Sequence, residues 1–258
     1  MKQSVALLVL ALVLAAGFVV VYVVRRRTGS LPTGPYAAFM GGTYGLLLGL
    51  LLFQTTGNVY AARNATVNEA ATLHAINAAA VGLPTASQDR IESDTVCVSR
   101  LIDGAEWALM RQGDLTGAPA VRAEIAQLGT DITSIPLDDP RAAAQYSAIF
   151  TRYLQFREQR DQALSLGDSR VPMTIWVIVF ALAFIIVVLI GLQQELGGRR
   201  ITIGVSALLV VMLALVVYFL SGLDRPYQGH YSVDPPSTLQ ALAAVTKTTN
   251  GTAIACPR

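Results

Sequence analysis

The chain has 258 residues, of which 53% are hydrophobic and 14% charged, and its formal net charge is +2. A mean hydropathy of +0.51 is too apolar for an ordinary soluble domain, and the apolar residues are concentrated in blocks. The composition therefore predicts an integral membrane protein, and so small a net charge gives no support for nucleic-acid binding.

The first predicted element is an apolar run from Ser4 to Val24, long enough to span a bilayer and followed by Arg25, Arg26 and Arg27. A cleavable signal peptide is the alternative, but the run is too long for one and no A-x-A cleavage site follows it. We therefore expect a retained membrane helix. Because the three arginines outweigh Lys2 and the amino terminus, the positive-inside rule places the N-terminus outside the cytoplasm.

The second element begins with an apolar run over residues 37–53 and continues without a proline to Leu83. A single helix of these roughly 47 residues would be about 70 Å long, whereas a bilayer core takes up only about 30 Å. The same helix should therefore form a membrane span, to about Thr56, and then the first helix of an extramembrane region.

The membrane part of this helix carries a stripe of small residues. Gly41, Gly45 and Gly49 recur every four residues, a spacing that lets another helix approach closely. We favour packing within one subunit over a subunit interface or a pore wall, because glycines are common in membrane helices. Thr43 and Gln54 complete the candidate pore or helix-packing positions.

Residues 57–170 have helical periodicity throughout and predict an extramembrane helical bundle. Residues 85–88 (TASQ) have the form of a capping box, which would open a helix that ends at Gly113. A shorter helix over residues 119–128 and a longer one over 141–166 should follow. Since no segment shows strand-like alternation, the predicted fold class is all-α.

Two further spans, over residues 171–192 and 201–220, are joined by a short connection that contains Arg199 and Arg200. This basic loop agrees with the one after the first span, so the bundle and the C-terminus should both lie outside the cytoplasm. The expected organisation is two membrane helices (1–56), the bundle (57–170), two more membrane helices (171–220) and an extramembrane tail (221–258).

Several segments, distributed over most of the chain, resemble the bacterial bestrophin-like family of unknown function. They are YGLLLG (44–49), YAAR (60–63), VNEA (67–70), EW (106–107), LDRPYQG (223–229) and VDP (233–235). The resemblance implies four membrane helices with a helical domain inserted between the second and third. True bestrophins form pentameric anion channels, so it also implies a homopentamer with the second span around a pore.

The sequence departs from true bestrophins at two places. Their pore neck has clustered phenylalanines beside an isoleucine and a proline, whereas this span offers only Phe39, Tyr44 and Phe53, and no proline. Their calcium site draws on an acidic cluster after the fourth span, whereas here Asp224 stands beside Arg225 and the acids do not continue as a cluster. We therefore do not expect calcium gating. The predicted topology also places the bundle opposite to the cytosolic domain of bestrophins.

A catalytic function is not expected. The two histidines, His74 and His230, have no carboxylate or cysteine at ligand spacing, and no serine lies in a nucleophile elbow. We expect no metal and no cofactor. Two functions remain, both in the lipid bilayer of the cell membrane: a homo-oligomeric anion channel, or a non-catalytic subunit or scaffold of a larger membrane complex.

Cys97 and Cys256 are the only cysteines, and the predicted topology places both in an oxidising compartment, where a disulfide is favoured. The alternative is a buried apolar Cys97 and a free thiol in the tail. A second expected tail contact involves Asp224 and Arg225, with Arg225 paired to a carboxylate of the bundle. The alternative for this segment is a simple helix-ending turn.

Overall fold

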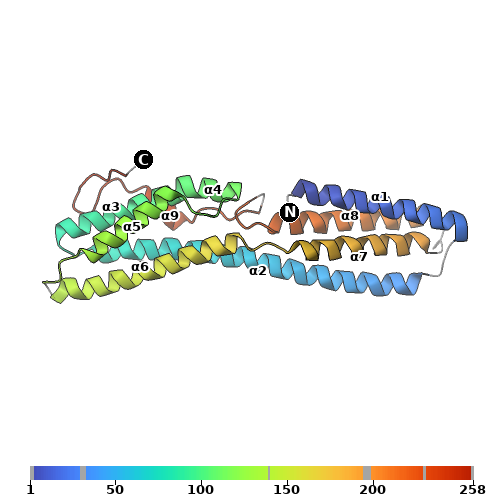
Figure 1. Cartoon of the computed structure of the whole chain (residues 1–258), viewed down its shortest axis with the longest axis horizontal. Helices are drawn as coiled ribbons and strands as arrows, with labels where there is room; N and C mark the ends of the chain where they lie inside the picture. Colours follow the sequence, from blue (N-terminus) through green and yellow to red (C-terminus); the bar gives the residue numbers. More distant parts are fainter. Residues whose placement is uncertain (1–2, 30–32, 139, 194–198, 229–230, 257–258) are drawn as a thin grey trace. The chain divides into compact units, whose positions relative to one another are not determined.

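The computed structural model describes residues 3–29, 33–138, 140–193, 199–228 and 231–256, and over these residues the fold is all-helical (Figure 1). They contain no β-strand beyond an isolated bridge between Lys247 and Ala253. The predicted all-α fold class is thus confirmed. The chain divides into two compact units, which we call the membrane unit (1–57 and 170–225) and the extramembrane unit (58–169 and 226–258). His230 lies outside the described residues.

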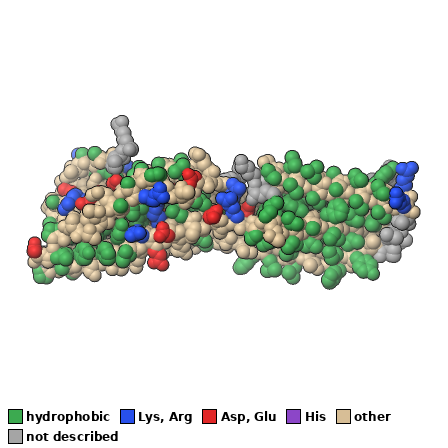
Figure 2. Space-filling model, viewed as in Figure 1, with side chains coloured by type: hydrophobic (Ala, Val, Ile, Leu, Met, Phe, Trp, Pro, Cys, Tyr) green, Lys and Arg blue, Asp and Glu red, His purple; other side chains and the backbone are tan. Residues whose placement is uncertain are grey.

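The membrane unit contains α1 (Gln3–Thr28), the first part of α2 (Gly34–Ala80), α7 (Met173–Leu192) and α8 (Arg199–Leu223). Among the described residues, α1, α2 and α7 are long and apolar enough to cross a bilayer, and residues 207–223 of α8 form a shorter apolar segment. Hydrophobic side chains cover the visible face of this unit (Figure 2). Three candidate spans are therefore established, and the fourth stays a prediction.

Small residues let α1 pack closely against α7. A Cβ atom at Gly191 of α7 would lie 2.5 Å from Cγ2 of Val21, and one at Gly17 of α1 would lie 3.1 Å from Cγ1 of Val187. Such separations are too short for a larger side chain without a shift of the helices. One glycine on each helix therefore sets the helix separation at this end of the interface.

The second predicted element is a single helix in the structure, α2, of 47 residues. It ends three residues before the predicted limit, Leu83. Gly82 has a φ of 97°, which a helix cannot contain, and Pro84 follows it. The membrane span and the first bundle helix are therefore parts of one helix.

Proline at Val59 should break this helix just beyond its membrane part. The substitution removes a backbone hydrogen bond and introduces a ring clash, at a cost of about 3 kcal/mol. Val59 also packs against the bundle core, so Val59→Ala is the control that loses side-chain contacts but keeps the backbone. Thermal unfolding followed by circular dichroism should show a much lower midpoint for Val59→Pro. Equal midpoints for the two variants would argue against a continuous helix.

The extramembrane unit is a helical bundle that contains the rest of α2. Its other helices are α3 (Thr85–Leu101), the π-helix η1 (Ile102–Glu106), α4 (Trp107–Gln112), α5 (Pro119–Thr133), α6 (Pro140–Gly167) and α9 (Ser237–Ala243). α3 packs against α5 and α9, and α5 packs against α6. Fully buried aliphatic and aromatic side chains from these helices form one core, among them Leu73, Ile91, Leu128, Ile149 and Phe156.

Three local predictions for this unit were wrong. The capping box is not formed, because Pro84 takes the N-cap position and Thr85 already lies in the first turn. The helix predicted to run to Gly113 is interrupted by η1. α5 continues to Thr133 because Ile132 still packs in the core. α9, in the tail, was not predicted.

Candidate functional site

A buried charge cluster lies inside the extramembrane unit. Nη1 of Arg160 donates to Oε1 of Glu69 at 3.3 Å, and its Nη2 donates to Oε1 and Oε2 of Glu106 at 2.7 and 2.8 Å. The side chains of Arg160 and Glu69 are each 8% exposed, and that of Glu106 is 2% exposed. One guanidinium therefore contacts two carboxylates, and all three groups are largely buried.

Three different elements supply this cluster. Glu69 lies on the buried face of α2, four residues from Ala65 and from Leu73, both of which are buried. Glu106 is the last residue of the π-helix η1, and Arg160 comes from α6. π-Helical segments are rare in proteins, and where one occurs it frequently lies at a functional site. Here the turn ends at a buried acid.

A glycine and an aromatic pair enclose the cluster. Gly117 has a φ of 77°, and a Cβ there would lie 3.5 Å from Nη2 of Arg160, so the loop backbone passes directly over the guanidinium. The hydroxyl of Tyr227 donates to the Ala163 carbonyl at 3.0 Å, and the ring of Tyr227 meets that of Trp107 edge-to-face at 5.8 Å. Tyr227 and Trp107 are both almost fully buried, so this side of the cluster is covered by packed aromatic rings.

Burial is the main cause of the altered acidity in the cluster. It raises the pKa of Glu69 to about 7; Arg160 opposes the shift and Glu106 adds to it. Burial also raises the pKa of Glu106, again with Arg160 opposing. The pKa of Tyr227 is raised by burial and then by the two glutamates. Within the cluster, Glu69 is thus the carboxyl whose pKa burial raises to near neutrality.

The raised pKa of Glu69 predicts a pH-dependent stability. Because the pKa is higher in the folded than in the unfolded state, the folded protein binds more protons, and this contribution to stability is lost as the pH rises towards 7. We expect the unfolding midpoint of the extramembrane unit to fall between about pH 5 and 7. Unfolding can be followed by the fluorescence of Trp107. Glu69→Gln should weaken the dependence of the unfolding midpoint on pH. An unchanged dependence in that variant would show that other groups cause it.

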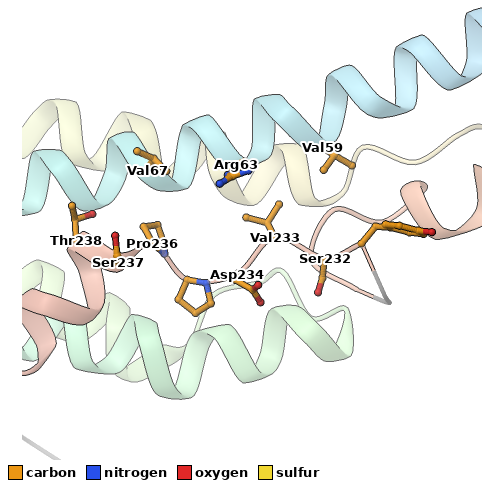
Figure 3. Close-up of a pocket in the computed structure, with 11 residues that line it drawn as sticks. Val59, Arg63, Val67, Ser232, Val233, Asp234, Pro236, Ser237 and Thr238 are labelled. Carbon is orange, nitrogen blue, oxygen red and sulfur yellow. The ribbon is translucent and has the colours of Figure 1, made fainter. Parts of the chain in front are cut away.

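A pocket of about 400 Å³ lies elsewhere in the same unit, between α2 and the tail segment 231–238 (Figure 3). Val59, Arg63 and Val67, each four residues apart, form one wall, and the tail residues, including Pro235 and Pro236, form the other. Two segments that resemble the bestrophin-like family, 60–63 and 233–235, are far apart in the sequence. Both contribute residues to this one pocket.

The glycine stripe on α2 does not pack within the chain. A Cβ at Gly41, Gly45 or Gly49 would meet no described atom within 4 Å, and all three residues are exposed. The within-subunit packing that we favoured is therefore wrong for the described residues. The face of α2 that packs into the hydrophobic core of the membrane unit is the one with Tyr44 and Leu48.

Thr43 and Gln54 are also exposed on α2, on a different side from the glycines. At about 100° per residue, both lie roughly 160–180° around the helix from Gly45. The hydroxyl of Thr43 donates to the Phe39 carbonyl at 3.1 Å. The five candidate residues therefore form two separate strips on the exposed part of α2 and cannot all face one pore.

The structure joins Cys97 and Cys256 by a disulfide, with an S–S distance of 2.07 Å. Polar contacts that the sequence did not reveal reinforce this attachment of the tail to α3. Glu92 accepts from the backbone N–H and the hydroxyl of Thr249 at 2.6 and 2.7 Å, and Nε of Arg100 donates to the Ala243 carbonyl at 2.9 Å.

Asp224 is buried at the end of α8, and its Oδ1 accepts from the Val171 N–H at 2.7 Å, within the membrane unit. The pairing of Arg225 with a bundle carboxylate stays a prediction. Among the described residues, no three His, Cys, Asp or Glu side chains are grouped so that they could hold a metal ion.

The buried charge cluster was not predicted from the sequence. Glu69 and Glu106 lie in the segments 67–70 and 106–107 that carry the family resemblance, so a signal for both glutamates was present. No such sequence signal marked Arg160, because it lies in an ordinary polar stretch of a long helix.

Comparison with known proteins identifies relatives of the whole chain. The model of the bestrophin-like domain matches residues 6–238. A bacterial bestrophin homologue from Klebsiella pneumoniae, solved as a single-site variant, has 14% identity and a TM-score of 0.68 over 94% of this chain and 97% of that one. A variant described only as a membrane protein has 13% identity and a TM-score of 0.70, over 93% and 96%. Comparison with curated sequences found no significant match.

Proposed function

The chain belongs to the bestrophin-like family, and from this we propose that it is the subunit of a homo-oligomeric, most simply pentameric, anion channel in the cell membrane. The observation that carries the proposal is the open face of α2. Its glycines contact nothing in their own chain, and Phe39, Leu46 and Phe53 beside them are 74%, 67% and 81% exposed. A second copy of the chain, or lipid, has to cover these residues.

The two strips on α2 suggest different roles. Glycines favour close helix contact, so the strip of Gly41, Gly45 and Gly49 suits the neighbouring subunit. Thr43 and Gln54 offer neutral hydrogen-bonding groups, which can line an anion pore. In a ring of α2 helices, the strip of Thr43 and Gln54 would face the axis. The glycine strip, on the opposite side of the helix, would then face away from the axis, where an outer helix of a neighbouring subunit could pack against it.

Cysteine substitution tests this assignment. Thr43→Cys and Gln54→Cys should make anion flux sensitive to a charged, thiol-specific reagent, because both positions would face the aqueous pore. Leu48→Cys is the matched control, since Leu48 is 7% exposed and packs inside its own subunit. The measurement is flux through liposomes before and after the reagent. Inhibition of Leu48→Cys alone would place the pore on the other side of α2.

The proposed topology has four spans, with both termini and the bundle outside the cytoplasm. The basic residues in the last turn of α1 and at the start of α8 support it, as does a disulfide, which forms in oxidising compartments.

A scaffold of a larger membrane complex is the second candidate. Its support is the apolar character of α7, which has no charged residue over its 20 residues, and the firm attachment of the tail to α3. The mass of the purified, detergent-solubilised particle separates the two candidates. Several identical copies favour the channel. One or two copies, or a single copy in a hetero-complex, would contradict it.

A further inference from the structure

A second pocket of the extramembrane unit, of about 340 Å³, is lined by residues of α5 and α6. Its α6 wall is formed by Tyr153, Arg157, Arg160 and Asp161, which recur on one helix face. α5 contributes Arg122, Ile125 and Ala126. Because Arg160 is already paired with Glu69 and Glu106, Arg122 and Arg157 supply the positive charge of the pocket, against Asp161. The pocket is of a size that accommodates a small ligand.

Arg160 connects this pocket to the buried glutamates. With Glu69 and Glu106 both ionised, the buried cluster has a net charge of −1, which opposes the positive charge of Arg122 and Arg157 at the pocket. If Glu69 takes up a proton, the cluster becomes neutral and no longer offsets the net positive charge of the pocket. An anion in the pocket should therefore favour protonated Glu69.

We propose that this pocket is an anion site, for a small oxoanion or carboxylate, and that anion binding there is coupled to uptake of a solvent proton by Glu69. The site lies outside the membrane unit and does not depend on conduction through α2. It would let the bundle respond jointly to anion concentration and pH.

The charged groups around Glu69 are consistent with this coupling. Arg160, Glu106 and Asp161 act on it, and Tyr227 lies close enough to be affected by its charge. Burial places the pKa of Glu69 at about 7, within the range where a proton can be exchanged at neutral pH. Asp94, with a pKa raised to about 8 by burial and by Asp131, also titrates near neutrality, but it contacts neither the pocket nor the cluster in the described structure.

Isothermal titration calorimetry of the full chain in detergent tests the proposal, with sulfate as the probe because its charge is constant between pH 6 and 8. We expect saturable binding that is about fivefold or more tighter at pH 6 than at pH 8. Titrations at pH 7 in two buffers of different ionisation enthalpy should show net proton uptake. Arg157→Gln should weaken binding. Arg152→Gln, an exposed arginine on α6 outside the pocket, is the matched control and should not.

Two more variants locate the proton. Glu69→Gln should keep sulfate binding but lose its pH dependence and proton uptake, whereas Asp94→Asn should retain both. Absence of saturable binding, or equal binding by Arg157→Gln, would overturn the anion site. Equal affinity at pH 6 and 8 with no proton uptake by the unmodified chain would overturn the coupling, even if Glu69→Gln failed to fold. Neither result depends on whether the membrane unit conducts.

Discussion

Arg160→Leu should lower the stability of the extramembrane unit by about 3–5 kcal/mol, because it leaves Glu69 and Glu106 buried without a cation. The loss should be largest above neutral pH, where both carboxyls are ionised, and smaller in acid, where Glu69 is protonated. Thermal unfolding of the purified chain at pH 5.5 and 8, followed by Trp107 fluorescence, measures both effects.

The control for this experiment is Arg157→Leu, an exposed arginine on the same face of α6, which should change stability little. Neutralising the glutamates as well, with Glu69→Gln and Glu106→Gln, should recover much of the lost stability in the Arg160→Leu background. Near-native stability of Arg160→Leu alone would show that water reaches the cluster and that it is not a buried ion network.

Cys256→Ser should cost the next largest amount of stability. The bond closes a sequence separation of 159 residues, for which chain entropy gives a nominal stabilisation near 5 kcal/mol. We expect a smaller measured loss, because membrane insertion already restrains the unfolded chain. Since Cys256 is half-buried, the serine leaves no cavity in the core. The measurement is the unfolding midpoint without reductant.

A reductant separates the bond from the side-chain change. It should lower the midpoint of the unmodified chain to that of Cys256→Ser and leave the variant unchanged. Alkylation of the unreduced protein followed by mass spectrometry should detect one peptide linked through Cys97 and Cys256. Two freely alkylated cysteines would contradict the bond and weaken the proposed topology.

The helices of this protein could be predicted from local sequence because apolar runs and helical periodicity act within a few turns. α2 is the clearest example: the absence of proline over residues 37–83 predicted one long helix. Boundaries were less predictable where tertiary contacts decide them. Ile132 extends α5 by packing in the core, and the extended backbone of Pro84 displaces the expected cap.

The candidate sites depend on contacts between distant residues, and for that reason the sequence revealed little of them. Arg160 lies 91 positions from Glu69 and 54 from Glu106, and no local pattern marks that pairing. The glycine stripe was visible in the sequence, but whether it packs inside the subunit depends on which face of α2 the other membrane helices cover. That face carries Tyr44 and Leu48, not Gly45.

Anion flux through liposomes that contain the purified homo-oligomer is the most direct test of the proposed channel. We expect chloride efflux above that of protein-free liposomes, and its loss when Thr43→Cys or Gln54→Cys is modified by a charged thiol reagent. Efflux equal to that of protein-free liposomes, from a preparation shown to contain the assembled particle at pH values on both sides of 7, would contradict it.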